Sequence, residues 1–165
     1  SRLSNEIVQN SLLLGGDRTN IIDRIYKSDD IFRNSGCGPK LYVEAYSKIV
    51  HKKIIKVGIS KDIFSFLEET KKTLFIISAT PQKELINLCS DLKIDKYFSG
   101  IFGTPNSKKE NFNVIFKSNN FKVEDTIFFG DMLSDQNAAK DMNIQFSPVF
   151  SKESDLLPVS INPLF

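Results

Sequence analysis

From Gly58 onward, short apolar runs alternate with segments of helical pattern, and this alternation constrains the fold more than any other feature of the 165-residue chain. Runs that are rich in β-branched and aromatic residues and end at a small or polar residue are typical of buried strands. Strands that alternate with helices form a parallel sheet joined by right-handed crossovers. The sequence therefore predicts an α/β fold with a Rossmann-like parallel-sheet core.

The chain divides near residue 53 into two regions of different pattern. Residues 1–53 show helical patterns only, which predicts an all-helical region, and residues 54–165 form the α/β core. The tail from Ser151 contains two prolines, which favour an irregular strap. We expect N-terminal helices at 3–13, 19–27 and 40–52, core helices at 61–71, 82–92, 108–119 and 134–142, and strands at 73–78, 99–102, 125–130 and 144–149.

A hydroxyl ends the first core strand. The apolar run 74–77 leads into Ser78, and the following Thr80-Pro81 pair has the N-cap and first-turn chemistry of a helix start. The free N–H groups of a helix N-terminus favour an anion, so Ser78 is a candidate phosphate ligand. Taken alone, Ser78 is interpreted equally well as a satisfied turn hydroxyl.

A lysine begins a later helix. Ser107 and Glu110 have the spacing of a capping box, which places Lys108 at the first helical position. Cations at a helix N-terminus oppose the macrodipole, and a bound anion would reverse that penalty. Lys108 is therefore a candidate anion ligand, and its alternative role is that of a surface lysine beside Lys109.

Two carboxylates follow the third core strand. Asp131 comes directly after Gly130 at the predicted strand end, and Asp135 falls near the start of the next helix. The carboxyl ends of parallel strands are where ligands bind in open α/β sheets, and hard oxygen ligands suit Mg²⁺. The alternative is a helix-capping aspartate beside a solvated one.

The hydroxyl, the lysine and the paired carboxylates, in this order, resemble the motifs of the haloacid dehalogenase-like superfamily, whose members are mostly Mg²⁺-dependent phosphotransferases and phosphatases. The run Gly-Thr-Pro-Asn-Ser-Lys-Lys-Glu at 103–110 is similar to that of the phosphoglycolate-phosphatase-like branch. The resemblance, which spans residues 58–146, implies that Ser78 and the backbone of Ala79 bind phosphate together with Lys108. It also implies that Asp131 binds Mg²⁺ directly and that Asp135 is a second ligand or acts through water.

The resemblance also implies that the all-helical residues 1–53 are part of a small cap, and it adds one further candidate site residue. Arg18 follows Gly15-Gly16-Asp17 at the start of a predicted helix, in a run similar to the cap segment that family members place above the active site. This similarity implies that Arg18 contacts the substrate. The alternative is an arginine that is exposed at the surface.

One family motif is missing. An apolar strand ending in Asp-x-Asp carries the family's nucleophile and its general acid/base, and no Asp-x-Asp occurs in the 165 residues. We expect the chain to begin after this motif, so the missing strand would come from the parent chain or from another segment. In the family that strand lies between the strand ending at Ser78 and the one ending at Asp131.

The resemblance implies a Mg²⁺-dependent phosphatase that acts on a small phosphate monoester, a phosphorylated metabolite, through an aspartyl-phosphate. The chain alone would be inactive for want of the nucleophile. Two alternatives stay open: a nucleophile-free module that binds phosphate ligands or partners, and a phosphomutase of the same fold. A dehalogenase is disfavoured, because dehalogenases use no metal and the chain retains Asp131 and Asp135.

Composition narrows the class of partner. A net charge of +2 gives no case for nucleic acid, and no apolar stretch is long enough to predict a membrane span. Cys37 and Cys89 match no zinc spacing and favour a reduced, cytoplasmic protein. His51, the only histidine, is expected to be an exposed helix-end residue and not a general base.

Overall fold

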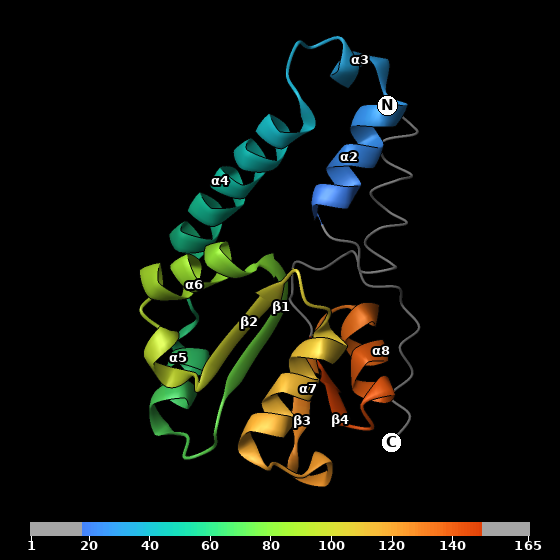
Figure 1. Cartoon of the computed structure of the whole chain (residues 1–165). Coiled ribbons are helices and arrows are strands. Elements are labelled where there is room, and N and C mark those ends of the chain that lie inside the picture. The colour runs from blue at the N-terminus through green and yellow to red at the C-terminus, as the bar shows by residue number, and fades with distance from the viewer. Residues whose placement is uncertain (1–17, 150–165) are drawn as a thin grey trace.

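The computed structural model describes residues 18–149 (Figure 1). The predicted helix at 3–13 and the strap from Ser151 lie outside these residues. No helix in the described range is long and apolar enough to cross a membrane. The α/β class is confirmed, because helices and short parallel strands alternate from residue 61 onward.

The N-terminal part is helical, as predicted. It comprises α2 (Arg18–Ser28), the short α3 (Asp30–Arg33) and α4 (Pro39–Val57), and α2 packs against α4. We call these three helices the helical unit. The end predicted for α4 at residue 52 is wrong, since the helix continues to Val57, and Gly58, at φ 71°, ends it.

Helix α4 leaves large apolar side chains exposed. Leu41 and Ile49 are 53% and 56% exposed. Neither α2 nor α4 has a buried residue.

The core begins with α5 (Lys61–Glu69) and contains four short strands. The strands are parallel within two pairs, in which β1 pairs with β2 and β3 pairs with β4. The remaining elements are β1 (Phe75–Pro81), α6 (Gln82–Asp91), β2 (Gly100–Thr104), α7 (Lys108–Asn119), β3 (Ile127–Gly130), α8 (Leu133–Asp141) and β4 (Gln145–Pro148), with 3₁₀ turns at Asp95–Tyr97 and Val123–Asp125.

The two strand pairs form two separate sheets. Within residues 18–149, no strand pairs with both β1 and β3, so the inner edges of these two strands lack a common neighbour. Helix α7 lies between the two pairs in Figure 1 and contacts both β1 and α8. The parallel pairing expected from the sequence is therefore present, in two halves instead of one continuous sheet.

Each half has its own hydrophobic cluster. Leu67, Leu85, Cys89 and Ile94 form the first, beside β1 and β2, and Phe112, Ala138, Ala139 and Ile144 form the second, beside β3 and β4. Strand β1 contributes to both, since Ile76 packs against the first cluster and Ile77 against the second. The clusters thus meet across β1, whose two faces are both covered.

Three phenylalanines of residues 18–149 are exposed, and the least exposed of them is Phe121, at 37%. Phe66 and Phe129 are 51% and 60% exposed. Phe129 alternates along β3 with Phe128, whose ring meets that of Phe112 edge-on at 4.9 Å between centroids. One face of β3 is therefore packed and the other is open.

Candidate functional site

Ser78 lies near the carboxyl end of β1 in a local turn. Its Oγ accepts a hydrogen bond from the Thr80 N–H and donates one to Thr80 Oγ1, both at 3.1 Å. The prediction that Thr80 caps the next helix is wrong, because β1 stays extended through Pro81, which pairs with Thr104, and α6 begins only at Gln82. Ser78 thus has the turn role, at a strand end where it also faces the pocket described below.

The Gln82 side chain joins the ends of β1 and β2. Its Nε2 donates to the Ile101 carbonyl at 2.7 Å, and its Oε1 accepts from the Gly103 N–H at 2.5 Å. Gly103 has no room for a side chain, since an added Cβ would lie 2.4 Å from the Thr80 carbonyl. The loop that leads from β2 to α7 is therefore held close to Ser78.

Lys108 occupies the first position of α7, as the capping box predicts. The Ser107 hydroxyl accepts from the Glu110 N–H, and the Glu110 carboxylate accepts from the Ser107 N–H at 2.7 Å. The backbone N–H and the hydroxyl of Ser107 together lower the pKa of Glu110 below its ordinary value. The cap is therefore charged at neutral pH and fixes the direction in which α7 presents its first residue.

The Lys108 side chain crosses to the second half of the core. Its Nζ lies 2.7 Å from Asp135 Oδ1 and donates to Ser134 Oγ at 2.8 Å. The Lys108 and Asp135 side chains are 17% and 9% exposed, so this ion pair is largely removed from solvent. It connects the helix that follows β2 with the helix that follows β3.

Asp135 is held from two sides. Its second carboxylate oxygen, Oδ2, accepts a hydrogen bond from the Met132 N–H at 3.1 Å. Gly130 permits this approach, because an added Cβ there would lie 2.4 Å from the Asp135 Cβ. Both carboxylate oxygens of Asp135 therefore have partners within the chain.

Asp131 differs from Asp135. It is exposed at the end of β3, and no hydrogen bond or ion pair engages its carboxylate among residues 18–149. The same residues contain no group of three or more His, Cys, Asp or Glu side chains that could hold a metal ion. Mg²⁺ commonly binds through one or two carboxylates and keeps several waters, so Asp131 fits as one ligand of an incomplete site.

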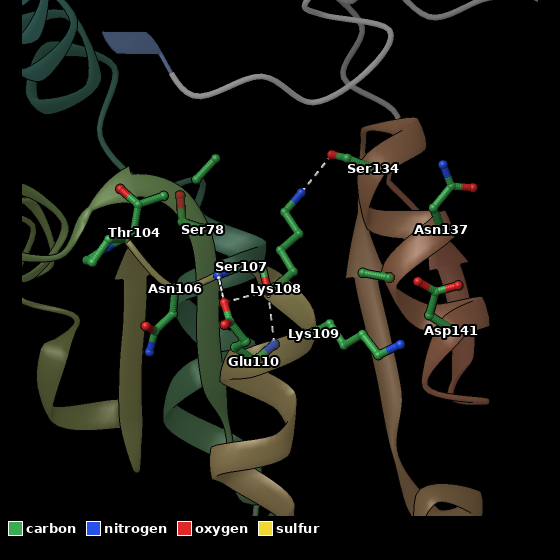
Figure 2. A pocket seen from close by; sticks show the side chains of 13 residues that line it. Ser78, Thr104, Asn106, Ser107, Lys108, Lys109, Glu110, Ser134, Asn137 and Asp141 are labelled. Atoms are coloured by element: carbon green, nitrogen blue, oxygen red, sulfur yellow. Dashed lines mark hydrogen bonds between the residues drawn. The ribbon is translucent and has the colours of Figure 1, made fainter. Parts of the chain in front are cut away.

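A pocket of about 450 Å³ brings Ser78, Ala79 and Lys108 together (Figure 2). Its α8 wall, formed by Ser134, Asn137 and Asp141, was not predicted from the sequence. Their spacing places them on one face of the helix but does not show that this face lies opposite α7. Lys109 also lines the pocket, but its side chain diverges from that of Lys108, which reaches Ser134 (Figure 2). Asp131 and Arg18 are not part of the lining.

Arg18 lies at the start of α2, where its guanidinium is paired. Its Nη1 donates to Glu84 Oε1 at 2.7 Å and to Ser47 Oγ at 2.8 Å. The guanidinium carbon also lies 5.5 Å from the centre of the Tyr46 ring. Contact with a substrate stays a prediction for this residue.

His51 does not lie at a helix end, where the sequence predicts it. It lies inside α4 and not at its end, because the helix continues to Val57, and its side chain is 24% exposed. The imidazole Nε2 lies 2.8 Å from Asp91 Oδ2 on α6.

Comparison with known proteins gives a match to one family model and matches to solved structures. A family model described as haloacid dehalogenase-like hydrolase matches residues 9–149. A candidate phosphatase from Clostridium difficile superposes with a TM-score of 0.60 at 22% identity, over 87% of this chain and 77% of that one. A haloacid dehalogenase-like hydrolase from Streptococcus pneumoniae superposes with a TM-score of 0.56 at 21% identity, over 87% and 76%. No curated protein matches the chain.

Proposed function

The chain belongs to the haloacid dehalogenase-like hydrolases, and from that premise we propose that it forms part of a Mg²⁺-dependent phosphatase acting on a small phosphate monoester. The single observation that supports this best is the position of Lys108. Its ammonium group lies between Ser134 and Asp135, in the same pocket as Ser78. A cation and a hydroxyl at adjacent strand and helix ends suit a phosphoryl group.

In the proposed site, Ser78 and the backbone N–H of Ala79 hold phosphoryl oxygens together with Lys108. Charge spreads over the equatorial oxygens of a phosphoryl group in the transition state, so donors aimed there stabilise it. Asp135 has a supporting role, because it holds the Lys108 ammonium in place and neutralises it until an anion binds.

Asp131 is the residue that we propose for Mg²⁺. Its exposed carboxylate has no competing partner in the described structure, whereas both oxygens of Asp135 are engaged. When bound, Mg²⁺ would neutralise phosphoryl charge. Asp135 would then support the metal through water and not as a direct ligand.

The nucleophile has to come from another segment. The proposed reaction is attack of an aspartate carboxylate on phosphorus with departure of the alcohol, followed by attack of water on the aspartyl-phosphate to release inorganic phosphate. We propose that a parallel strand between β1 and β3 carries this aspartate. Two observations on residues 18–149 support this position. The inner edges of β1 and β3 have no common neighbour, and α7 contacts both β1 and α8.

A second candidate function is a nucleophile-free module that binds phosphate ligands. The absence of Asp-x-Asp from the 165 residues favours it. This candidate predicts phosphate binding without turnover.

The experiment is a Mg²⁺ titration of phosphate-monoester hydrolysis in a protein that joins this chain to a strand ending in Asp-x-Asp. Asp131→Asn should abolish most of the Mg²⁺-dependent turnover, because it removes an anion from the ion's coordination shell. Asp125→Asn, at an exposed aspartate in a surface turn, is the matched control and should change nothing. Near-wild-type hydrolysis by Asp131→Asn at low Mg²⁺ would refute the metal assignment, and phosphate binding with no hydrolysis by the unmutated protein would favour the second candidate.

A further inference from the structure

Helix α6 carries two carboxylates on the side that faces the helical unit. Glu84 lies in the first turn and Asp91 at the last position, seven residues apart and hence on one face of the helix. Leu85 and Cys89 lie on another face and are buried in the first cluster. One side of α6 is thus anchored in the core, and the other presents an acidic group at each end.

The helical unit meets each of these carboxylates with a cation or an imidazole. Arg18 of α2 pairs with Glu84 at 2.7 Å, and His51 of α4 contacts Asp91 at 2.8 Å. Ser47, one turn before His51 on the same face of α4, accepts a second hydrogen bond from Arg18. The two contacts therefore engage both ends of α6 and both long helices of the unit.

The Arg18–Glu84 pair is the more protected of the two. Its side chains are 15% and 21% exposed, whereas the Asp91 side chain is 59% exposed. The Tyr46 ring also lies beside the guanidinium, at a distance suited to a cation–π contact. An ion pair shielded in this way is screened less by salt than one at the surface.

Within residues 18–149, little apolar packing holds the helical unit in place. Neither α2 nor α4 contains a buried residue, and Leu41, Ile49 and Val57 of α4 are 53%, 56% and 85% exposed. When few buried apolar contacts join two parts of a molecule, the polar contacts between them control their separation.

We propose that Glu84 and Asp91 form a two-point polar latch that holds the helical unit on the core, with Glu84 as the positioning residue for Arg18. Because α6 follows β1 directly, the latch sets the helical unit beside the strand end that carries Ser78 (Figure 1). This proposal goes beyond the phosphatase function and does not depend on it.

The test is amide hydrogen exchange of the full chain, in a form joined to an added strand that ends in Asp-x-Asp if the chain alone aggregates. Glu84→Gln should accelerate exchange in α2 and α4 by on the order of tenfold and leave α7 and α8 unchanged, because Arg18 loses its anchor but the core is intact. The double variant Arg18→Glu with Glu84→Arg should restore slow exchange. Asp23→Asn is the matched control, since it removes an ion pair within α2 that does not reach the core, and it should leave α4 unchanged.

Three results would overturn the latch. The first is unchanged exchange in α2 and α4 of Glu84→Gln. The second is equal acceleration in α7 and α8, which would mean that Glu84 only stabilises the core. The third is fast exchange in the charge-swap variant when Glu84→Gln also accelerates exchange. That result would show that loss of the pairing between Arg18 and Glu84 does not cause the faster exchange.

Discussion

The two strand pairs of this molecule are covered to different degrees. Strand β1 packs on both faces, with Ile76 against the cluster beside α5 and α6 and Ile77 against the cluster beside α7 and α8. Strand β3 packs on one face only, through Phe128, and leaves Ile127 and Phe129 48% and 60% exposed. In α/β proteins both faces of a parallel sheet are normally covered. The β3–β4 half is therefore the less complete of the two.

The candidate site draws residues from both halves. Ser78 lies near the end of β1 and Lys108 begins the helix that follows β2, whereas Asp131 and Asp135 follow β3. The Lys108–Asp135 ion pair connects these two sets of residues, and α7 contacts both β1 and α8. The proposed anion-binding residues thus come from β1 and the start of α7, and the proposed metal ligand comes from the end of the more open strand, β3.

The largest expected effect concerns the residue that joins the halves. Lys108→Ala should lower kcat for phosphate-monoester hydrolysis by about 10²–10³-fold in an active protein that contains this chain, because a donor to the developing charge is lost. Inhibition constants for vanadate and phosphate should rise as well. Steady-state kinetics measure both quantities.

Lys109→Ala is the matched control for this prediction. Successive residues on a helix point about 100° apart, and the two lysine side chains diverge in the pocket. Lys109→Ala should leave both constants nearly unchanged. Equal effects of the two substitutions would mean that the site does not depend on the Lys108–Asp135 connection.

A somewhat smaller effect is expected at the close contact within the second half. Gly130→Ala should reduce the free energy of unfolding by about 3 kcal/mol, because the new Cβ would lie 2.4 Å from that of Asp135. Gly38→Ala, where an added Cβ meets nothing within 4 Å, should cost no more than about 1 kcal/mol, through the poorer N-cap preference of Ala at the start of α4. Denaturant unfolding measures both, and a tolerated Gly130→Ala would show that Asp135 is free to move.

The smallest expected effect tests the open face of β3. Phe129→Ala should change the free energy of unfolding by less than about 0.5 kcal/mol, whereas Phe128→Ala, next to it on the packed face, should cost about 3 kcal/mol. The same denaturant measurement applies. If both substitutions cost the same, the outer face of β3 is covered and the contrast between the two halves fails.

Much of this arrangement could be predicted from local sequence patterns. The capping box predicted Lys108 at the start of α7, and Leu85 and Cys89, whose four-residue spacing is typical of one helix face, are both buried in α6. Such features depend on neighbours three or four residues away, which the sequence displays directly.

The missed features depend on contacts between distant segments. Thr80 has the chemistry of a cap, but pairing of Pro81 with Thr104 keeps β1 extended past it. Likewise, the ion pair between Arg18 and Glu84 joins residues 66 positions apart, and no periodic pattern in the sequence predicts it. The pocket wall on α8 was missed for the same reason, because its partner α7 lies elsewhere in the chain.

The central claim is that the two halves form one phosphatase site and that a further strand, ending in Asp-x-Asp, fits between β1 and β3. It is tested most directly by comparing residues 1–165 with the same chain extended at its N-terminus by an apolar strand ending in Asp-x-Asp and its loop, about 25 residues in all. Unpaired strand edges promote aggregation, so the short chain should aggregate or melt without cooperativity and should show no phosphatase activity. The extended chain should be monomeric, melt cooperatively and hydrolyse phosphate monoesters with Mg²⁺. Cooperative melting and Mg²⁺-dependent hydrolysis by residues 1–165 alone would contradict the account.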